Sequence, residues 1–515
     1  MERIALIVCI VCASIAPAAF AADKAEARPA PFAIEVVDEQ TGRGVPLVEL
    51  RTTSNVRYYT DSAGLAAVDE PGLMGQTVFF HVWSHGYEVA PDGFGMRGRR
   101  LDVTPGGSAK VPIKRLNIAK RLYRITGAGI YHDSVVLGRS VPIRRPLLNA
   151  KVTGQDSTQA AVYRGKIHFF WGDTNRLAYP LGHFGTAAAT AQLPAKGGLD
   201  PSAGVDLEYL VDGEGFSRPV FAKEDNNPIW LDGLFVLKDK QGVERLVGKA
   251  SVQKSLNETV ARRLVVFNDE KGAFDTLKEI PLDAPLHPQA HPLRAEDNGV
   301  AYVYCGNVFP NIRFKADWDS MLDVSGYEAF TCLAPGSREG DGAKLERDGQ
   351  GKLVWGWKRD TAALGTRDLL KLMDKEKVEP GEAWPATRDV ETKRPLVLAL
   401  QSVQYNAFRK RYVGIGVQLG GKSSYLGEIY YSEADRPEGP WPWARKVITH
   451  DRYSFYNPVQ HPFFEQEGGK VIYFEGTYVT TFSRDDREAT PRYDYNQIMY
   501  RLDLSDARLA LPSAE

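Results

Sequence analysis

The feature that most constrains the fold is a unit of two strand-like runs joined by a short turn, which recurs between residues 120 and 510. Five copies can be placed, at residues 161–171, 234–268, 300–333, 411–448 and 470–504. Their turns are rich in glycine and charged residues, as in Asp239-Lys-Gln-Gly242. Radial repetition of strand-rich units, which leaves few exposed sheet edges, is typical of a β-propeller. We therefore predict an all-β fold with a five-bladed β-propeller over residues 120–510.

Two segments do not repeat the unit. A polar insert covers residues 335–394, and within it residues 366–377 carry leucines and a methionine at helical spacing, which predicts one helix packed on the propeller. The segment that begins at Tyr123 precedes the first unit. We expect it to close the ring by adding a strand to the last blade.

Residues 32–115 predict a separate, small β-sandwich. Apolar and polar residues alternate in short runs that are separated by turn sequences. The pattern resembles the carboxypeptidase-regulatory or transthyretin-like modules, with a Thr-Asp-x-x-Gly turn at residues 60–64 and a Gly-Tyr pair at residues 86–87. Such modules serve as spacers or attachments, so the resemblance implies no chemistry here. His81 and His85 stand at strand spacing, which favours structural histidines over a metal pair.

The amino-terminal segment is typical of a signal peptide. Arg3 precedes an apolar run over residues 4–15, and Ala19-Phe-Ala21 offers a small-x-small cleavage site. The run is too short for a membrane span. We expect residues 1–21 to be removed and the protein to be exported, to the periplasm or the outside of the cell.

Charge and cysteine content exclude several classes of protein. A formal net charge of −1 gives no global field for nucleic acid. Beyond the signal segment only Cys305 and Cys332 remain, which either pair or stay as buried thiols. The histidines and cysteines show no metal-ligand spacing, so we expect no metal and no cofactor.

Two aspartates stand out because each lies at the end of a strand-like run. Asp156 follows Gly154-Gln155 and precedes an alternating run, and Asp173 ends another in a Gly-Asp-Thr-Asn turn. Carboxylates held at adjacent strand ends can share one pocket, as acid/base chemistry on a sugar bond requires. The alternative is that both only cap turns, since aspartate is a favoured turn residue.

Several segments together resemble the five-bladed propeller glycoside hydrolases, namely families 32, 43, 62, 68 and 117 and their arabinanase-like relatives. Residues 428–441 match a strand, an acidic turn and Gly-Pro-Trp, and residues 402–413 match a strand, an asparagine and a basic turn. Residues 170–174 resemble the Phe-Gly-Asp-Thr of the endo-D-arabinanase-like propellers, and residues 471–478 place a glutamate at the end of an apolar strand.

The resemblance implies a funnel on the propeller axis, lined by acids from the innermost strands of different blades. Asp173 or Asp156 would be the base or nucleophile, and Glu475 the general acid. The apolar neighbours of Glu475 favour its protonated form, whereas the donor-rich turn around Asp173 favours the ionised form. The alternative for Glu475 is a structural ion pair, for example with Arg484 or Arg492.

Further candidates would contact the substrate. Trp230 and Asp232 open the second unit, where Asp232 either orients the acid or is an ordinary turn residue. Arg313 and Asn406 would hold hydroxyl groups or an acidic substituent, with ion pairing as the alternative for the arginine. Aromatic rings stack on sugar faces, and we expect Trp171 and Tyr478 to face the pocket because they neighbour the acids.

The sequence therefore predicts an exported glycoside hydrolase that cleaves a poly- or oligosaccharide. A non-catalytic carbohydrate-binding or surface-adhesion protein is the alternative. A lyase or an enzyme of sulfated sugars would need a basic, tyrosine-rich pocket, for which the chain offers Tyr453, Tyr456, Tyr493 and Tyr495 beside Arg452 and Arg492.

Overall fold

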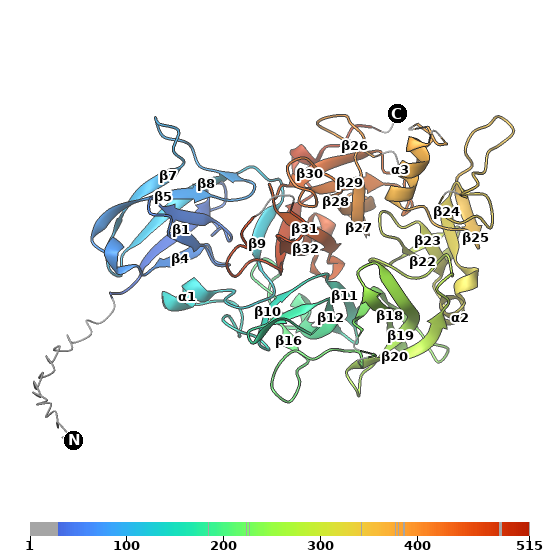
Figure 1. Ribbon diagram of the computed structural model, residues 1–515, viewed down its shortest axis with the longest axis horizontal. Coiled ribbons are helices and arrows are strands. Elements are labelled where there is room, and N and C mark those ends of the chain that lie inside the picture. The colour runs from blue at the N-terminus through green and yellow to red at the C-terminus, as the bar shows by residue number, and fades with distance from the viewer. Residues whose placement is uncertain are drawn as a thin grey trace, which may run out of the picture.

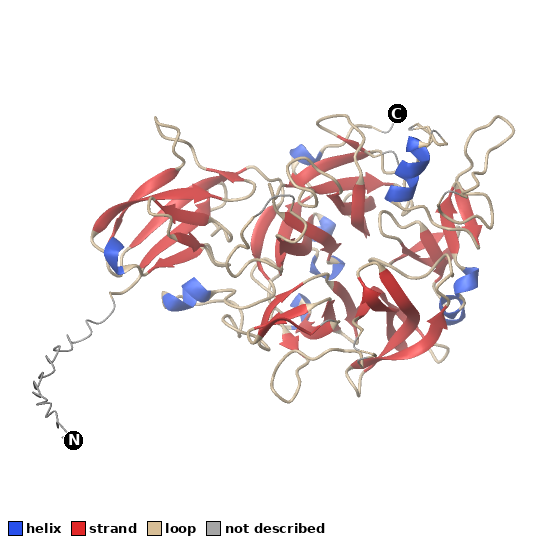
Figure 2. Ribbon diagram, viewed as in Figure 1, coloured by secondary structure: helices blue, strands red, loops and turns tan. Residues whose placement is uncertain are grey.

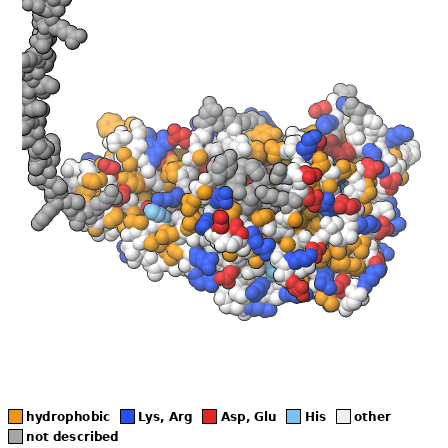
Figure 3. Space-filling model, turned by 60° about the horizontal axis from the view of Figure 1, so that its bottom comes forward, with side chains coloured by type: hydrophobic (Ala, Val, Ile, Leu, Met, Phe, Trp, Pro, Cys, Tyr) orange, Lys and Arg blue, Asp and Glu red, His pale blue; other side chains and the backbone are white. Residues whose placement is uncertain are grey.

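The computed structural model describes residues 29–513, except residues 184, 223, 226, 341, 376, 380, 385–386 and 484–486. The predicted signal peptide, residues 1–21, lies outside the described residues. No helix among the described residues is both long and apolar enough to span a membrane. Figure 3 shows a face on which acidic and basic side chains alternate without a field of one sign.

Residues 32–115 form two four-stranded sheets packed face to face, with orders β4-β1-β8-β6 and β3-β2-β5-β7 (Figure 1). Their strands are β1 (Phe32–Asp38), β2 (Glu49–Thr52), β3 (Arg57–Tyr59), β4 (Leu65–Val68), β5 (Gln76–Trp83), β6 (Tyr87–Glu88), β7 (Gly98–Val103) and β8 (Ser108–Arg115). The alternating residues of both sheets meet in one core that includes Ile34, Leu50 and Phe80.

Five further sheets stand around a common axis (Figures 1 and 2). Blade one is β11-β12-β15-β16, with a small sheet β10-β13-β14 beside it, and blade two is β17-β18-β19-β20. Their bounds are β10 (Val152–Gln155), β11 (Gln159–Tyr163), β12 (Lys166–Trp171), β13 (Thr174–Arg176), β14 (Tyr179–His183), β15 (Ala187–Gln192), β16 (Glu208–Tyr209), β17 (Ile229–Lys238), β18 (Glu244–Ser255), β19 (Glu258–Asn268) and β20 (Ala273–Ile280).

Blade three is β21-β22-β23-β24-β25, and blade four is β27-β28-β29-β30 with β26 at its outer edge. Their bounds are β21 (Leu293–Asp297), β22 (Val300–Cys305), β23 (Ile312–Lys315), β24 (Glu328–Thr331), β25 (Gly356–Arg359), β26 (Arg388–Asp389), β27 (Leu398–Asn406), β28 (Arg411–Gln418), β29 (Ile429–Ala434) and β30 (Trp443–Ile448).

Blade five closes the ring with a strand from the other end of the propeller. Its order is β31-β32-β33-β9, from β31 (Ser454–Gln460), β32 (Val471–Val479), β33 (Asn496–Asp503) and β9 (Lys120–Arg124). The expected closing strand therefore exists, although it ends at residue 124 rather than beginning at Tyr123. The chain is a five-bladed β-propeller preceded by a small β-sandwich, as predicted.

Helices are few and short. They are α1 (His132–Val136), α2 (Trp318–Leu322) and α3 (Thr366–Asp374), with 3₁₀ turns η1 (Pro71–Leu73), η2 (Pro194–Lys196), η3 (Val324–Gly326), η4 (Pro462–Phe464), η5 (Glu467–Gly469) and η6 (Ala507–Leu509). The predicted helix over residues 366–377 corresponds to α3 and ends three residues earlier. Leu372 of α3 packs with Leu364 and Leu333 against blade three.

The sandwich is fixed to the propeller by a buried arginine on the closing strand. Arg121 of β9 is 1% exposed, and it donates hydrogen bonds to the carbonyl oxygens of Pro46 and His85 and to the Ser84 hydroxyl, all in the sandwich. Its Nε donates to the Tyr500 hydroxyl of blade five. One side chain thus satisfies polar groups on both sides of the junction.

Candidate active site

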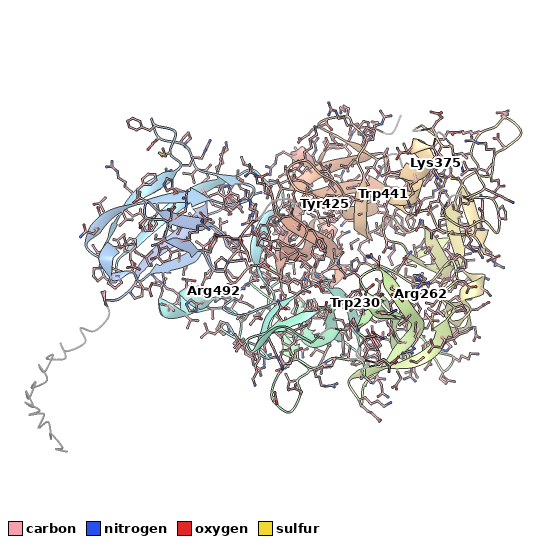
Figure 4. The ribbon with its side chains drawn as sticks, viewed as in Figure 1. Trp230, Arg262, Lys375, Tyr425, Trp441 and Arg492 are labelled. Carbon is pink, nitrogen blue, oxygen red and sulfur yellow. The ribbon has the colours of Figure 1, made fainter. Side chains whose placement is uncertain are left out.

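A cavity of about 400 Å³ opens on the propeller axis. It is lined by residues at or beside the first and second strands of blades one, two, three and five, among them Asp156, Asp173, Trp230, Asp232, His291 and Tyr456. Trp230 lies where blades one and two meet (Figure 4). The first strands converge on the axis in a propeller, so residues that are distant in sequence reach one pocket here.

The pairing of strands brings Asp156 and Asp173 together. Gln155 pairs with Thr174 across β10 and β13, and Gln159 pairs with Phe170 across β11 and β12. The residues between these pairs must therefore lie opposite each other. The backbone N–H of Asp173 donates to Oδ1 of Asp156 over 3.1 Å.

The glycine before Asp173 is required by this close approach. The Gly172 N–H donates to the carbonyl oxygen of Asp156 over 2.8 Å, and a Cβ at this position would lie 2.3 Å from Oδ1 of Asp156. Any larger residue would push the first carboxyl away from the second. The Gly-Asp dipeptide in the sequence thus has a steric cause.

Burial first, and the neighbouring charge of Asp173 second, raise the pKa of Asp156 to about 7. The hydroxyl of Tyr456 donates to Oδ2 of Asp156 over 2.8 Å, and this hydrogen bond, with one from Tyr495, moves the pKa in the opposite direction. The net shift of the pKa is upward because burial outweighs these hydrogen bonds, so protonated Asp156 is present at neutral pH.

Asp173 also has a raised pKa, caused by burial, but its hydrogen bonds counteract the shift. Its Oδ1 accepts from the indole Nε1–H of Trp230 over 3.0 Å and from the backbone N–H of Gly185 over 3.1 Å. Both donors stabilise the ionised form. Of the two neighbours, Asp156 is therefore the better proton donor and Asp173 the better base.

Asp232 lines the same cavity from β17 but is neutralised. Its Oδ2 lies 3.0 Å from Nζ of Lys249, and its Oδ1 accepts from the backbone N–H groups of Gly233 and Ala290 over 2.9 and 2.8 Å. The ion pair and the two N–H groups hold the carboxylate in place. This geometry suits a residue that orients the site, and Lys249 supplies the positive charge.

The backbone around Asp156 adopts a conformation that L-residues rarely take. Ser157, Asn457 and Tyr495 have φ values of 52°, 49° and 61°. Asn457 Nδ2 donates to Ser157 Oγ over 2.5 Å and locks two of these positions together. Left-handed non-glycine residues concentrate at functional sites, where surrounding contacts hold them in place.

Glu475 does not reach the cavity. It is fully buried on β32, where its Oε1 lies 2.8 Å from Nε2 of the equally buried His461. All nine residues of β32 are buried, because this strand is the second of its blade and packs between neighbours on both faces. The expected role as general acid is therefore corrected to that of a structural partner of His461. In the alternative of a structural ion pair, Arg492 is not the partner, because it pairs with Asp133, and Arg484 lies outside the described residues.

The two aromatic residues expected beside the acids lie in the core. Trp171 is 1% exposed and stacks on Phe169, with ring centroids 5.8 Å apart. Tyr478 is also 1% exposed, and its hydroxyl lies 3.0 Å from Nε2 of His85 in the sandwich. Neither ring can stack on a sugar in the axial cavity, so both predictions were wrong.

Arg313 and Asn406 are likewise structural. Arg313 lies between the rings of Tyr302 and Trp357 and forms ion pairs with Asp297 and Glu328. Asn406 donates from Nδ2 to the carbonyl oxygen of Gly469 over 2.7 Å, within blades four and five. Both were expected to contact the substrate, and both lie outside the axial cavity.

Other residues of the cavity were missed as part of this site. Tyr456 was considered only for a lyase, and Lys249 and His291 were not placed there. Burial lowers the pKa of His291 to about 4, so this imidazole is neutral at physiological pH. Asn457-Pro458 on the strand that carries Tyr456 was the available signal, because proline marks an irregular strand.

No set of three or more histidine, cysteine, aspartate or glutamate residues is arranged to hold a metal ion within the described ranges. Cys305 and Cys332 are buried free thiols rather than a disulfide. The cavity also differs from a basic, tyrosine-rich one, because three carboxylates line it and its lysine is paired with one of them.

No protein-family model and no curated protein matches the sequence. Solved structures do match, at low identity. A candidate hydrolase from Bacteroides ovatus is 12% identical, with 69% of this chain and 89% of that chain covered and a TM-score of 0.42. A β-1,3-galactosidase of glycoside hydrolase family 43 is 9% identical, with 75% and 60% covered and a TM-score of 0.34.

A family 43 enzyme from Xanthomonas citri in complex with xylotriose is 12% identical, with 68% of this chain and 86% of that chain covered and a TM-score of 0.32. The galactosidase and the Xanthomonas citri enzyme are named as members of family 43, one of the families that the sequence resembles. At such TM-scores the likeness supports no conclusion about function, which depends on the geometry of the axial cavity.

Proposed function

We propose that the protein is a glycoside hydrolase whose catalytic pair is Asp156 and Asp173. The observation that carries the proposal is the neighbouring position of the two carboxyls in an open axial cavity, one with a pKa of about 7 and the other with two hydrogen-bond donors that counteract the effect of burial on its pKa. Two carboxyls of unlike ionisation are the chemical requirement for hydrolysis of a glycosidic bond.

In this mechanism Asp156 donates its proton to the leaving oxygen as the bond from the anomeric carbon breaks. Asp173 removes a proton from a water molecule, whose oxygen forms the new bond to the anomeric carbon. One proton is given and one is taken, so the pair returns to its starting state by passing a single proton from Asp173 to Asp156. Asp232, held by Lys249, and the half-buried Trp230 position the sugar.

The alternative of a non-catalytic carbohydrate-binding protein has less support. A binding site needs no protonated carboxyl at neutral pH, and burying one without a use costs stability. The proposal also includes export of the mature chain, which is supported by the sequence of residues 1–21.

The test is a screen of the purified protein against plant, algal and microbial glycans, with reducing ends as the readout. On a glycan that is cleaved, Asp156→Asn and Asp173→Asn should each lower kcat/KM by about 10²–10⁴, the usual contribution of a general acid or base. Glu475→Gln is the matched control and should keep most of the activity, because the amide preserves the contact with His461.

Two results would overturn the assignment. One is full activity of either aspartate variant on a confirmed substrate. The other is loss of activity in the Glu475→Gln variant at an unchanged melting temperature, which would return the acid role to Glu475.

A further inference from the structure

A second and larger cavity, of about 1210 Å³, lies at the junction of the sandwich and the propeller. Arg57, Tyr59 and Trp83 line it from the sandwich, and Lys422, Tyr453 and Arg487 line it from blades four and five. A neighbouring cavity of about 320 Å³ shares Arg57, Tyr59 and Pro491 with it, and Arg492 in its wall marks this side of the propeller in Figure 4. We call the two together the junction groove.

The size of the junction groove indicates a chain-like ligand. Sites for single small molecules usually have volumes of about 300–1,000 Å³, and the larger cavity alone exceeds this range. The second cavity shares three wall residues with it and adds further volume beside it. None of the residues that line the axial cavity lines the junction groove.

The charges at the larger cavity leave an excess of positive groups. Its carboxylates are already engaged: Glu488 accepts from Arg57 over 2.7 Å, and Glu49 accepts from the Tyr59 hydroxyl over 2.8 Å. Asp451 lies 4.0 Å from Arg452.

Two cations of the same wall have no such partner. In the described part of the chain, Lys422 and Arg487 form no ion pair with a carboxylate. Two cations without an ion-pair partner among the described residues favour an anionic ligand in this cavity.

The sandwich contributes an aromatic surface next to these cations. Trp83 ends β5 and is 43% exposed, although a tryptophan of this size is usually more buried. The His85 ring packs against it edge to face, with ring centroids 4.5 Å apart and an angle of 70° between the ring planes. An exposed indole that lines the same cavity as two cations can stack on the apolar face of a sugar ring while the cations bind its acidic group.

We propose that the junction groove binds an acidic oligosaccharide, a chain of sugars that carries carboxylate or sulfate groups, at a site separate from the catalytic cavity. The saccharide class rests on the proposed function, whereas the preference for negative charge rests on the groove itself. The sandwich thereby forms half of a binding site and is more than a spacer.

The experiment is calorimetric titration of the full mature chain with four hexameric probes. These are hexagalacturonate, a sulfated hexasaccharide, neutral maltohexaose and hexaglutamate. We expect one or both acidic sugars to bind at least tenfold more tightly than maltohexaose and hexaglutamate. Hexagalacturonate binding alone assigns a carboxylated sugar, and binding of the sulfated probe alone assigns a sulfated one.

Two variants connect the binding to the junction groove. Trp83→Ala and the double variant Lys422→Ala/Arg487→Ala should each weaken binding of the acidic probe at least tenfold. Phe94→Ala, at a sandwich position that is 92% exposed and away from the groove, is the matched control and should leave binding unchanged. Melting curves confirm that each variant is folded.

The proposal is overturned if no acidic sugar binds, if maltohexaose or hexaglutamate binds equally well, or if binding survives in both groove variants. The readout does not require turnover, so failure of the proposed hydrolysis would not affect it. Conversely, activity on a small soluble glycoside should be unchanged in the Trp83→Ala variant, because Trp83 is absent from the axial cavity.

Discussion

Three influences set the pKa of Asp156. Burial and the charge of Asp173 favour the protonated form, and the hydroxyl groups of Tyr456 and Tyr495 favour the ionised form. The carboxyl remains half-buried at the cavity wall, so it can still contact a ligand. A residue that titrates near pH 7 in such a place is a candidate acid/base group on physical grounds.

The proposed mechanism gives a pH dependence with a definite sign. Asp156 must be protonated, so kcat/KM should fall as pH rises through about 7. Tyr456→Phe removes a hydrogen bond that stabilises the ionised carboxylate, which raises the pKa of Asp156 and moves the basic limb to higher pH. The measurement is kcat/KM against pH for both proteins. A limb that stays in place or moves to lower pH would contradict this role of Tyr456.

The raised pKa of Asp156 should also make the free energy of unfolding depend on pH. Its pKa rises from 3.8 to about 7 on folding, so between these values the folded chain holds a proton that the unfolded chain releases. The free energy of unfolding therefore falls as pH rises through this window, by up to about 4 kcal/mol at about 1.4 kcal/mol per pKa unit.

Asp156→Asn removes this pH-dependent contribution to the free energy of unfolding. As pH rises from 5 to 8, the variant should therefore gain stability relative to the parent protein, as measured by denaturant unfolding. Asp435→Asn, at a carboxylate whose side chain is 78% exposed, is the control and should give a constant difference. An equally constant difference for Asp156→Asn would show that burial does not perturb this group.

At the scale of the element, the strand that carries a side chain and its place along that strand decide whether it reaches the axial cavity. Asp156, Trp230 and Tyr456 lie at the first strands of their blades, which border the axis, and they reach the cavity. Trp171 and Glu475 lie within second strands that pair with a strand on each side, and both side chains are buried. On the second strand of blade two, by contrast, Lys249 reaches the cavity. The apolar run before Glu475 is thus a sign of full burial, and the Glu475→Gln control tests this directly.

At the scale of the whole molecule, the sandwich and the propeller share a polar, buried junction. Tyr493 of blade five donates to the carbonyl oxygen of Thr60 over 2.6 Å and accepts from the backbone N–H of Leu47 over 3.1 Å. Arg121 is buried there, and its partners among the described residues are carbonyl and hydroxyl oxygens rather than carboxylates. Such a network binds the two parts only while it is complete.

Arg121→Met should therefore weaken the junction strongly. The substitution removes the donors to Pro46, Ser84 and His85 and leaves buried oxygens unpaired, at about 1–3 kcal/mol for each unsatisfied group. We expect the parent protein to unfold in a single calorimetric transition, and the variant to unfold at lower temperature in two separate transitions. Lys110→Ala, on a lysine whose side chain is 60% exposed, is the control. An unchanged single transition would mean that the junction does not depend on Arg121.

The sequence by itself determined the all-β class, the five blades, the closing strand and the partnership of Asp156 with Asp173. Strand alternation and turn residues are local signals, and the two aspartates flank one hairpin. Trp230 and Asp232 were also found, because they open the first strand of their blade. These parts could be predicted since each depends on short segments of chain.

Only the tertiary structure decided which residues face the axis and which carboxyl keeps its proton. Alternation shows that neighbouring side chains point to opposite faces, but it does not show whether either face borders a cavity, and so Glu475, Trp171 and Tyr478 were misplaced. The ionisation of Asp156 depends on Tyr456, which is 300 residues away in sequence and 2.8 Å away in space. Desolvation is a property of the assembled ring and cannot be read from any one segment.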